Sequence, residues 1–440
     1  MNNKQLTIKN NTNLALNKSK DLLNITDNIL ANKTLAVSDD AWKYEFITWA
    51  RSLRIRNLPS LNINNVLNIT ELDLSNNELT EVPAFIGNFI NLTFLNLSNN
   101  RLVSLPSSIG NLSKLTSLNL TENRLTNLPE SIGNLSKLAR LYLSCNQLIE
   151  LPNFLFVLSN LTYLDLWENK LIKLNENIEI LSKLDELQLG RNELTEIPVS
   201  IGNLKNLRLL RLSENKISEL PESIGKLSKL TTLIVKNNEL REIPISIGNL
   251  SNLTGIYISG NKLIEIPESL GKLSNLTDIY ITGNEIIRIP ESIGNLSNLI
   301  NLDLCSNKIT TLPESIGMLK KLDRLILSCN KLNKLPESIG KLSSLTKLDL
   351  QYNQLISLPD SIGELSELTG LYLAKNNLTK IPDSIGKLGK LGCLQLHENK
   401  LNDLPISLGN LHKLYNLGLI KNPIKSLPVE LSDLKNIVKF

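Results

Sequence analysis

Asparagine recurs at a fixed interval of 23 residues through most of this chain, and no other feature constrains the fold as strongly. The series begins at Asn77 and ends at Asn422 without a gap. A repeat of this length indicates a solenoid, in which each copy forms one coil and buries its apolar side only against its neighbours. The sixteen positions are 77, 100, 123, 146, 169, 192, 215, 238, 261, 284, 307, 330, 353, 376, 399 and 422.

Each copy alternates apolar and polar residues just before its asparagine. In the copy that spans residues 92–114, Leu95 and Leu97 flank a polar residue, which is the period of a strand with one buried face and one solvated face. Stacked copies therefore predict a parallel sheet, with the later leucines and isoleucines of each copy returning on the opposite side. We expect short helical or 3₁₀ turns on that returning, convex side.

The full frame is LxxLxLxxNxLxxLPxxIGxLxx, seen in residues 92–114 and again in 299–321. This frame resembles the leucine-rich repeat family, and its 23-residue length resembles the intracellular Ras-group and scribble-type arrays and the near-identical arrays of some bacteria. The resemblance implies an α/β solenoid, the leucine-rich repeat horseshoe, with a parallel concave sheet. We assign residues 57–440, with about sixteen repeats, to the solenoid.

Residues 1–56 carry no repeat and are assigned as an N-terminal helical cap with a disordered start, because terminal coils expose apolar core. Trp42, Phe46, Trp49 and Leu53 share one face of a helix that begins near Ser38. The segment 14–30 is a second helical candidate, and residues 58–69 resemble a degenerate entry coil. At the other end only Ile437, Val438 and Phe440 shield the final coil, so we expect a short terminal helix or a partner surface to cover it.

The recurring asparagine is expected to be structural. A chain that turns sharply after each strand leaves backbone groups without sheet partners, and an amide side chain can satisfy both donors and acceptors. The residue one place earlier, for example Asn76 or Asn99, is expected to face water.

Aromatic residues, only 4% of the chain, gather at positions that packing does not require. Such residues dominate the energy of many interfaces, although exposed strand positions also favour tyrosine for its β propensity. Three groups follow from adjacency: Tyr142, Tyr163 and Trp167 with Arg140; Tyr257 with Tyr280; Tyr352 with Tyr372. The candidate partner-binding residues on the concave face are Phe94, Arg140, Tyr142, Tyr163, Trp167, Tyr257, Tyr280, Tyr352 and Tyr372.

The convex pattern fails beside the first aromatic group. Phe156 and Glu179 replace the repeated glycine, and Asn175 replaces the repeated proline. A departure on both faces of the same coils marks a binding site or neutral drift, and the sequence leaves both interpretations open.

Composition narrows the chemistry. A net charge of +4 from interspersed charges gives no footprint for nucleic acid or membrane. Four cysteines and two histidines form no metal-ligand spacing, and no nucleophile, base and phosphate-loop set can be assembled. Cys305 and Cys329 lie on adjacent coils but one place out of step. We therefore predict no catalytic residues, no metal and no cofactor.

These observations predict a non-enzymatic protein-interaction scaffold that binds a protein partner on its concave face. We expect a monomer, with end-to-end or concave-face association as alternatives. The absence of an apolar leader predicts a cytoplasmic protein or export by a route without a signal peptide. The alternatives are a bacterial effector or surface recogniser of a host protein or glycan and, more remotely, a relative of the bacterial repeat-type ubiquitin ligases that lacks their catalytic domain.

Overall fold

The computed structural model describes residues 41–53 and 63–439. By its backbone contacts the chain forms two compact units, Met1–Ile69 and Thr70–Phe440. The first unit contains the helix α2 (Ala41–Ser52) and the 3₁₀ turn η2 (Ile63–Asn68). The helical candidate at 14–30 and the disordered start lie outside the described residues.

Helix α2 confirms the predicted helix and corrects its buried face. Phe46 is fully buried and its ring lies 6.2 Å from that of Trp49. Leu53, in contrast, is exposed. The reason is that the helix ends at Ser52, so that Leu53 falls beyond the helical face. The capping role of this segment stays a prediction.

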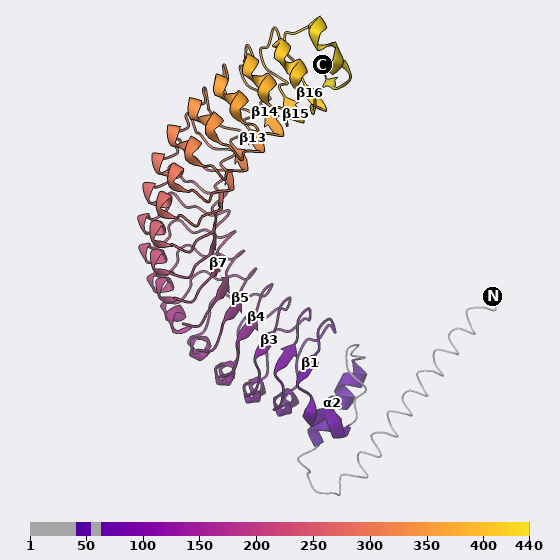
Figure 1. Cartoon of the computed structure of the whole chain (residues 1–440). Helices are drawn as coiled ribbons and strands as arrows, with labels where there is room; N and C mark the ends of the chain where they lie inside the picture. The colour runs from indigo at the N-terminus through magenta and orange to yellow at the C-terminus, as the bar shows by residue number, and fades with distance from the viewer. Residues whose placement is uncertain (1–40, 54–62, 440) are drawn as a thin grey trace, which may run out of the picture. The chain divides into compact units, whose positions relative to one another are not determined.

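The second unit is the predicted solenoid. Its strands form one parallel sheet in chain order, and all but the last are shifted by one repeat from the strand before, as in the pairing of Leu72 with Leu95. The strands are β1 (Glu71–Asp73), β2 (Phe94–Asn96), β3 (Ser117–Asn119), β4 (Arg140–Tyr142), β5 (Tyr163–Asp165), β6 (Glu186–Gln188), β7 (Leu209–Arg211), β8 (Thr232–Ile234), β9 (Gly255–Tyr257), β10 (Asp278–Tyr280), β11 (Asn301–Asp303), β12 (Arg324–Ile326), β13 (Lys347–Asp349), β14 (Gly370–Tyr372), β15 (Cys393–Gln395), β16 (Asn416–Gly418) and β17 (Val438–Lys439). Figure 1 shows the strands of this unit along the inner side of its arc.

Each coil, here called a rung, returns along the outer side through a 3₁₀ turn, as predicted (Figure 1). The turns are η3 (Ala84–Asn88), η4 (Ser107–Asn111), η5 (Glu130–Asn134), η6 (Asn153–Val157), η7 (Glu176–Ile180), η8 (Val199–Asn203), η9 (Glu222–Lys226), η10 (Ile245–Asn249), η11 (Glu268–Lys272), η12 (Glu291–Asn295), η13 (Glu314–Met318), η14 (Glu337–Lys341), η15 (Asp360–Glu364), η16 (Asp383–Lys387), η17 (Ile406–Asn410) and η18 (Val429–Asn436). The last turn, η18, is the 3₁₀ turn of the final repeat, extended to eight residues and followed by β17, and coverage of this end by a partner surface stays a prediction.

Packing between rungs explains the repeated glycine and serine of the outer side. A Cβ atom added to Gly340 would lie 2.3 Å from the backbone oxygen of Ser361 on the next rung. No side chain fits in that space, so glycine is required for the turns to stack at this spacing.

The asparagine column forms the ladder that the sequence predicts. The Asn238 amide nitrogen donates to the backbone oxygens of Leu212 (3.0 Å) and Lys236 (3.1 Å). Its side-chain oxygen accepts from the backbone N–H of Ile217 at 3.0 Å. Two of these three partners belong to the preceding rung, so each asparagine joins two coils while it satisfies buried backbone groups.

The residue just before each ladder asparagine has a positive φ angle, which the sequence analysis did not anticipate. Examples are Asn76 (59°), Cys145 (54°) and Tyr352 (54°), and only Gly260 and Gly283 are glycines at this position. The left-handed turn directs the side chain away from the core, and Asn76 and Asn99 are exposed as expected.

Candidate binding surface

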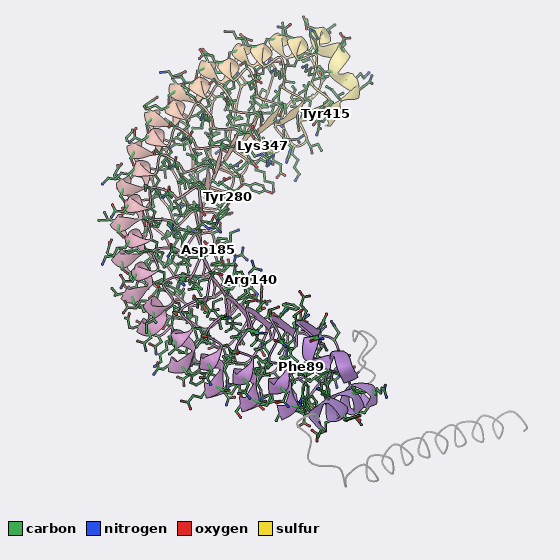
Figure 2. All side chains as sticks on the ribbon, turned by 60° about the horizontal axis from the view of Figure 1, so that its bottom comes forward. Phe89, Arg140, Asp185, Tyr280, Lys347 and Tyr415 are labelled. Carbon is green, nitrogen blue, oxygen red and sulfur yellow. The ribbon has the colours of Figure 1, made fainter. Side chains whose placement is uncertain are left out.

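Strand alternation directs the predicted site residues outward onto the concave side of the sheet, called the inner face below. In β5, Leu164 is fully buried, whereas Tyr163 and Asp165 on either side of it are partly exposed. The same pattern recurs along the array, and Figure 2 shows Arg140, Tyr280 and Lys347 along the inner side of the arc. The central geometric expectation is therefore confirmed: leucines point into the solenoid and the variable residues point out.

Within the first predicted group, Tyr142 and Tyr163 are brought together at β4 and β5, and Trp167 leans toward the following rung. The rings of Tyr142 and Tyr163 lie 4.9 Å apart with an interplanar angle of 39°. The register places Tyr163 opposite Arg140 and Tyr142 opposite Asp165, so the two tyrosines meet across a diagonal. Tyr142, Tyr163 and the partly exposed Trp167 are called the aromatic cluster.

The Trp167 ring lies against a glycine on the next rung. A Cβ atom added to Gly190 would lie 1.9 Å from Cζ3 of Trp167, so the indole occupies the space that a side chain at residue 190 would fill. A larger side chain at position 190 would clash with the indole, so glycine there leaves room for the ring to lie against the sheet. Preorganised aromatic surface of this kind lowers the entropic cost of binding.

The surroundings of Tyr163 make its hydroxyl harder to ionise than that of a free tyrosine. Burial, followed by the neighbouring charge of Asp165, raises the pKa of Tyr163 to about 12. Burial also raises the pKa of Asp165, against the lowering effect of the hydrogen bond it accepts from the Trp167 backbone N–H at 3.0 Å. Like an ordinary tyrosine, Tyr163 is protonated at neutral pH and available as a hydrogen-bond donor, and the raised pKa extends this to more alkaline pH.

Paired charges surround the aromatic cluster. Arg191 bridges Glu168 at 2.8 Å and Glu214 at 3.2 Å, both one rung away. Farther along the strands, Arg208 forms an ion pair with Asp185. Exposed pairs of this kind contribute little to stability but fix the polar rim around an apolar centre.

The second predicted group is also confirmed as a contact. Tyr257 and Tyr280 lie directly opposite each other on β9 and β10, with rings 5.2 Å apart and nearly parallel at 12°. The ammonium of Lys236 lies 5.2 Å from the Tyr257 ring. Burial is the main cause that raises the pKa of each of these tyrosines.

The third group differs from the expected tyrosine pair. Tyr352 and Tyr372 lie on adjacent rungs. Each ring contacts a lysine, and that lysine belongs to the rung of the other tyrosine. Lys375 lies 4.4 Å from the Tyr352 ring and Lys347 lies 5.2 Å from the Tyr372 ring. The remaining candidate, Phe94, is partly exposed on β2, opposite Ser117 and away from these groups.

Sequence reasoning missed the glycines under the rings. Besides Gly190, a Cβ atom at Gly255 would lie 2.8 Å from Cε2 of Tyr257, and one at Gly370 would lie 2.8 Å from Cε2 of Tyr372. Tyr415, which precedes β16, covers Gly392 in the same way and was not among the predicted residues. The available signal was glycine at a strand position, which marks a close approach by another group.

The described residues offer little reactive chemistry. Burial is the largest of the effects that raise the pKa values of the Cys145 and Cys329 thiols, which disfavours their thiolates. Residues 41–53 and 63–439 contain no group of three His, Cys, Asp or Glu placed to hold a metal ion. No helix within the same ranges has the length and apolar character that a bilayer crossing needs.

Comparison with known proteins agrees with this geometry. The family model described as a leucine-rich repeat region matches residues 48–189, 199–284 and 268–354, and the leucine rich repeat model matches residues 344–365 and 367–388. A search of curated protein sequences yields no match.

Solved structures of similar proteins come from bacteria and plants. A leucine-rich repeat protein of Leptospira interrogans is 32% identical, with a TM-score of 0.71 over 87% of this chain and 100% of that one. The ectodomain of the Arabidopsis thaliana receptor kinase GASSHO1/SCHENGEN3, solved with CASPARIAN STRIP INTEGRITY FACTOR 2, is 31% identical (TM-score 0.53; 82% of this chain, 51% of that one). The plant peptide hormone receptor RGFR1, solved with RGF2, is 28% identical (TM-score 0.61; 86% and 74%). With its repeats matched over most of their length, the chain belongs to the leucine-rich repeat family.

Proposed function

We propose that this protein is a non-enzymatic interaction scaffold that binds a protein partner on its inner face, with the aromatic cluster at the centre of the contact. The fit of Trp167 over Gly190 carries the proposal. Packing of the solenoid does not need a large ring there, and the fit holds an exposed aromatic surface in one position. Two similar structures, those of GASSHO1/SCHENGEN3 and RGFR1, were solved with protein or peptide partners.

The composition of the surface supports protein as the ligand. The cluster combines Tyr and Trp, which are enriched among residues that dominate interface energies, with a rim of paired charges. The Tyr163 hydroxyl is protonated at neutral pH, as an ordinary tyrosine is, and can donate a hydrogen bond to a partner. Apolar rings beside satisfied charges favour a folded or extended protein surface over a polyanion.

The test is quantitative capture of proteins from the source organism on immobilised protein, followed by affinity measurement for the captured partner. Replacing Tyr163 and Trp167 by alanine should weaken binding about 30-fold or more, the loss expected from one or two anchor residues. A matched control replaces Val199 and Ile245, which are exposed on the outer turns, by alanine. Undiminished binding by the Tyr163→Ala, Trp167→Ala variant, or equal loss in the control, would contradict the proposal.

A further inference from the structure

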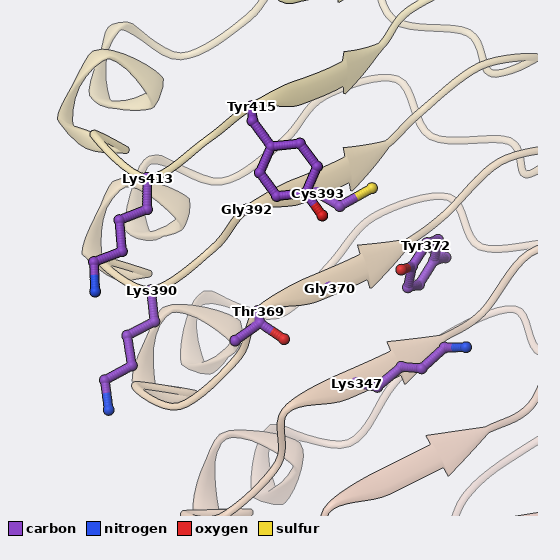
Figure 3. Close-up of a pocket in the computed structure, with 9 residues that line it drawn as sticks. All are labelled: Lys347, Thr369, Gly370, Tyr372, Lys390, Gly392, Cys393, Lys413 and Tyr415. Carbon is purple, nitrogen blue, oxygen red and sulfur yellow. The ribbon is translucent and has the colours of Figure 1, made fainter.

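A second hollow on the inner face lies far along the array from the aromatic cluster, over β13 to β16. It has a volume of about 320 Å³, and Figure 3 shows its lining. Gly370 and Gly392 lie on successive rungs, and the rings of Tyr372 and Tyr415 rest against them. This space is called the lysine hollow, after Lys347, Lys390 and Lys413 on its border.

The charged residues that line the lysine hollow are all lysines, and the carboxylates of Asp349, opposite Tyr372 in the sheet, and of Glu367 lie beside it. Its described lining contains three lysines and no carboxylate. Lys390 is bound to Glu367 at 2.6 Å, outside the lining, whereas no ion pair is recorded for Lys413 among the described residues. Lys347 contacts the Tyr372 ring, an interaction that leaves its positive charge in place.

The neighbouring rungs add to this excess. In mid-array, the residues after successive ladder asparagines alternate in sign and form ion pairs, such as Glu239 with Lys262 (2.9 Å) and Glu285 with Lys308 (2.7 Å). Beyond Lys308 the alternation stops, because Lys331, Gln354, Asn377 and Lys400 follow in this column. One column over, Lys375 and Lys421 share the single carboxylate of Glu398, at 3.7 Å and 3.5 Å.

The mixture of charges expected from the sequence is thus uneven in space. Mid-array charges pair across rungs, whereas in the C-terminal third, among the described residues, Lys347 and Lys413 border a concave recess without an ion pair and Lys390 pairs with Glu367. A recess lined by one sign of charge concentrates ligands of the opposite sign. The two tyrosines offer apolar ring surface and hydroxyl donors beside the lysines.

We propose that the lysine hollow binds a carboxylate-rich segment of a protein partner, a run of Asp and Glu residues in extended form. The proposal rests on the scaffold function above and names the chemistry of the partner at one part of the inner face. Lys347, Lys390 and Lys413 supply charge, and Tyr372 and Tyr415 pack against the methylene groups of the acidic side chains. The backbone N–H groups of Gly370 and Gly392 are already bonded to the preceding rungs, so the side chains must provide the donors.

The test uses a fluorescein-labelled peptide of ten glutamates as the probe, with binding to the full chain followed by fluorescence anisotropy at low and at physiological salt. The variant Lys347→Gln, Lys390→Gln, Lys413→Gln should lose at least tenfold in affinity. The control Lys226→Gln, Lys272→Gln, Lys341→Gln removes equal charge from exposed positions on the outer turns and should change affinity less than twofold.

Equal losses in the two variants would show that net charge alone attracts the probe and would overturn the proposal. So would absence of binding at low salt. Displacement of the probe by tripolyphosphate with more than tenfold tighter binding would assign the hollow to phosphate instead, and would also overturn it. The Tyr163→Ala, Trp167→Ala variant should bind the probe normally, so failure here is distinguishable from failure of the scaffold function.

Discussion

The regular rungs from η8 onward and the two rungs that contain η6 and η7 solve the same packing problem differently. In the regular rungs, glycine lets each 3₁₀ turn approach the next serine backbone closely, as Gly340 does with Ser361. In the other two, Phe156 and Glu179 stand in the glycine place, and Phe156 is almost completely buried. The buried Phe156 ring takes the place of the close backbone contact in the first of these rungs, whereas Glu179 in the second is exposed.

The backbone is nonetheless nearly unchanged. Asn175, in the proline place, has φ −71° and ψ 143°, close to the −71° and 150° of Pro152. Its side chain accepts a hydrogen bond from the Asn177 backbone N–H at 2.8 Å, and Glu179 accepts one from the Asn203 amide at 2.6 Å. The repeat length fixes the path of the chain, and different side chains can support it. The irregular outer turns are therefore no evidence of a binding site by themselves, and the aromatic cluster must be judged on its own contacts.

The largest expected effect on stability comes from a substitution in the irregular rungs. Phe156→Ala removes a buried ring that no glycine–serine contact can replace, so it should lower the free energy of unfolding by about 3–5 kcal/mol. Urea denaturation followed by circular dichroism measures it. Val157→Ala, at an exposed neighbour, should change stability by less than about 0.5 kcal/mol. A loss below about 1 kcal/mol for Phe156→Ala would mean that the ring is not structural.

A smaller effect tests the regular side. Gly340→Ala places a methyl group 2.3 Å from a backbone oxygen, so the rungs must shift, at a cost of about 1–3 kcal/mol. Gly389 is the matched control, because a Cβ atom there meets nothing within 4 Å. The same urea experiment should show Gly389→Ala within about 0.5 kcal/mol of the parent. Similar behaviour of the two variants would refute the close-approach explanation.

Part of the order on the inner face could be predicted from the sequence, and part could not. The period places Leu164 inside and Tyr163 outside, because a strand alternates and a one-residue slip would reverse every side chain. The period does not specify side-chain rotamers. Only the structure therefore shows the diagonal contact between Tyr142 and Tyr163 and the position of Trp167 against Gly190. The same holds for the lysine partners of Tyr352 and Tyr372. Ion pairs between rungs depend on which neighbours happen to carry opposite charge.

The smallest expected effect concerns a hydrogen bond from a serine backbone N–H to a glutamate on the preceding rung, which occurs in both regions. Glu176 beside the irregular turn accepts a hydrogen bond from the Ser200 backbone N–H (3.0 Å), and Glu222 in a regular rung does the same with Ser246 (2.9 Å). Hydrogen bonding to these serines lowers the pKa of each glutamate. Because the folded pKa lies below the unfolded value, the stabilisation is present above the unfolded pKa and is lost as pH falls through the folded pKa.

Urea midpoints at pH 7 and pH 3 measure this contribution. Between pH 7 and pH 3 the free energy of unfolding of the parent protein should fall. Glu176→Gln and Glu222→Gln should each make that fall smaller by about 0.3 kcal/mol, as expected for exposed groups. Equal reductions in the two variants would show that the glutamate–serine hydrogen bond contributes independently of the glycine–serine contact. A parent-like pH dependence in both would contradict it.

The asparagine ladder gives the array a polarity. Each ladder side chain reaches back to the rung before it, as Asn422 does when it accepts from the Leu401 backbone N–H and donates to the Leu396 oxygen. In the rung of Asn422 the equivalent N–H, that of Ile424, turns instead to the Leu401 oxygen at 3.0 Å. Severing the array between any two rungs is consequently asymmetric. The upstream piece is left with an unanswered backbone donor, and the downstream piece with an amide that keeps the acceptor of its own rung and has lost the one from the rung before.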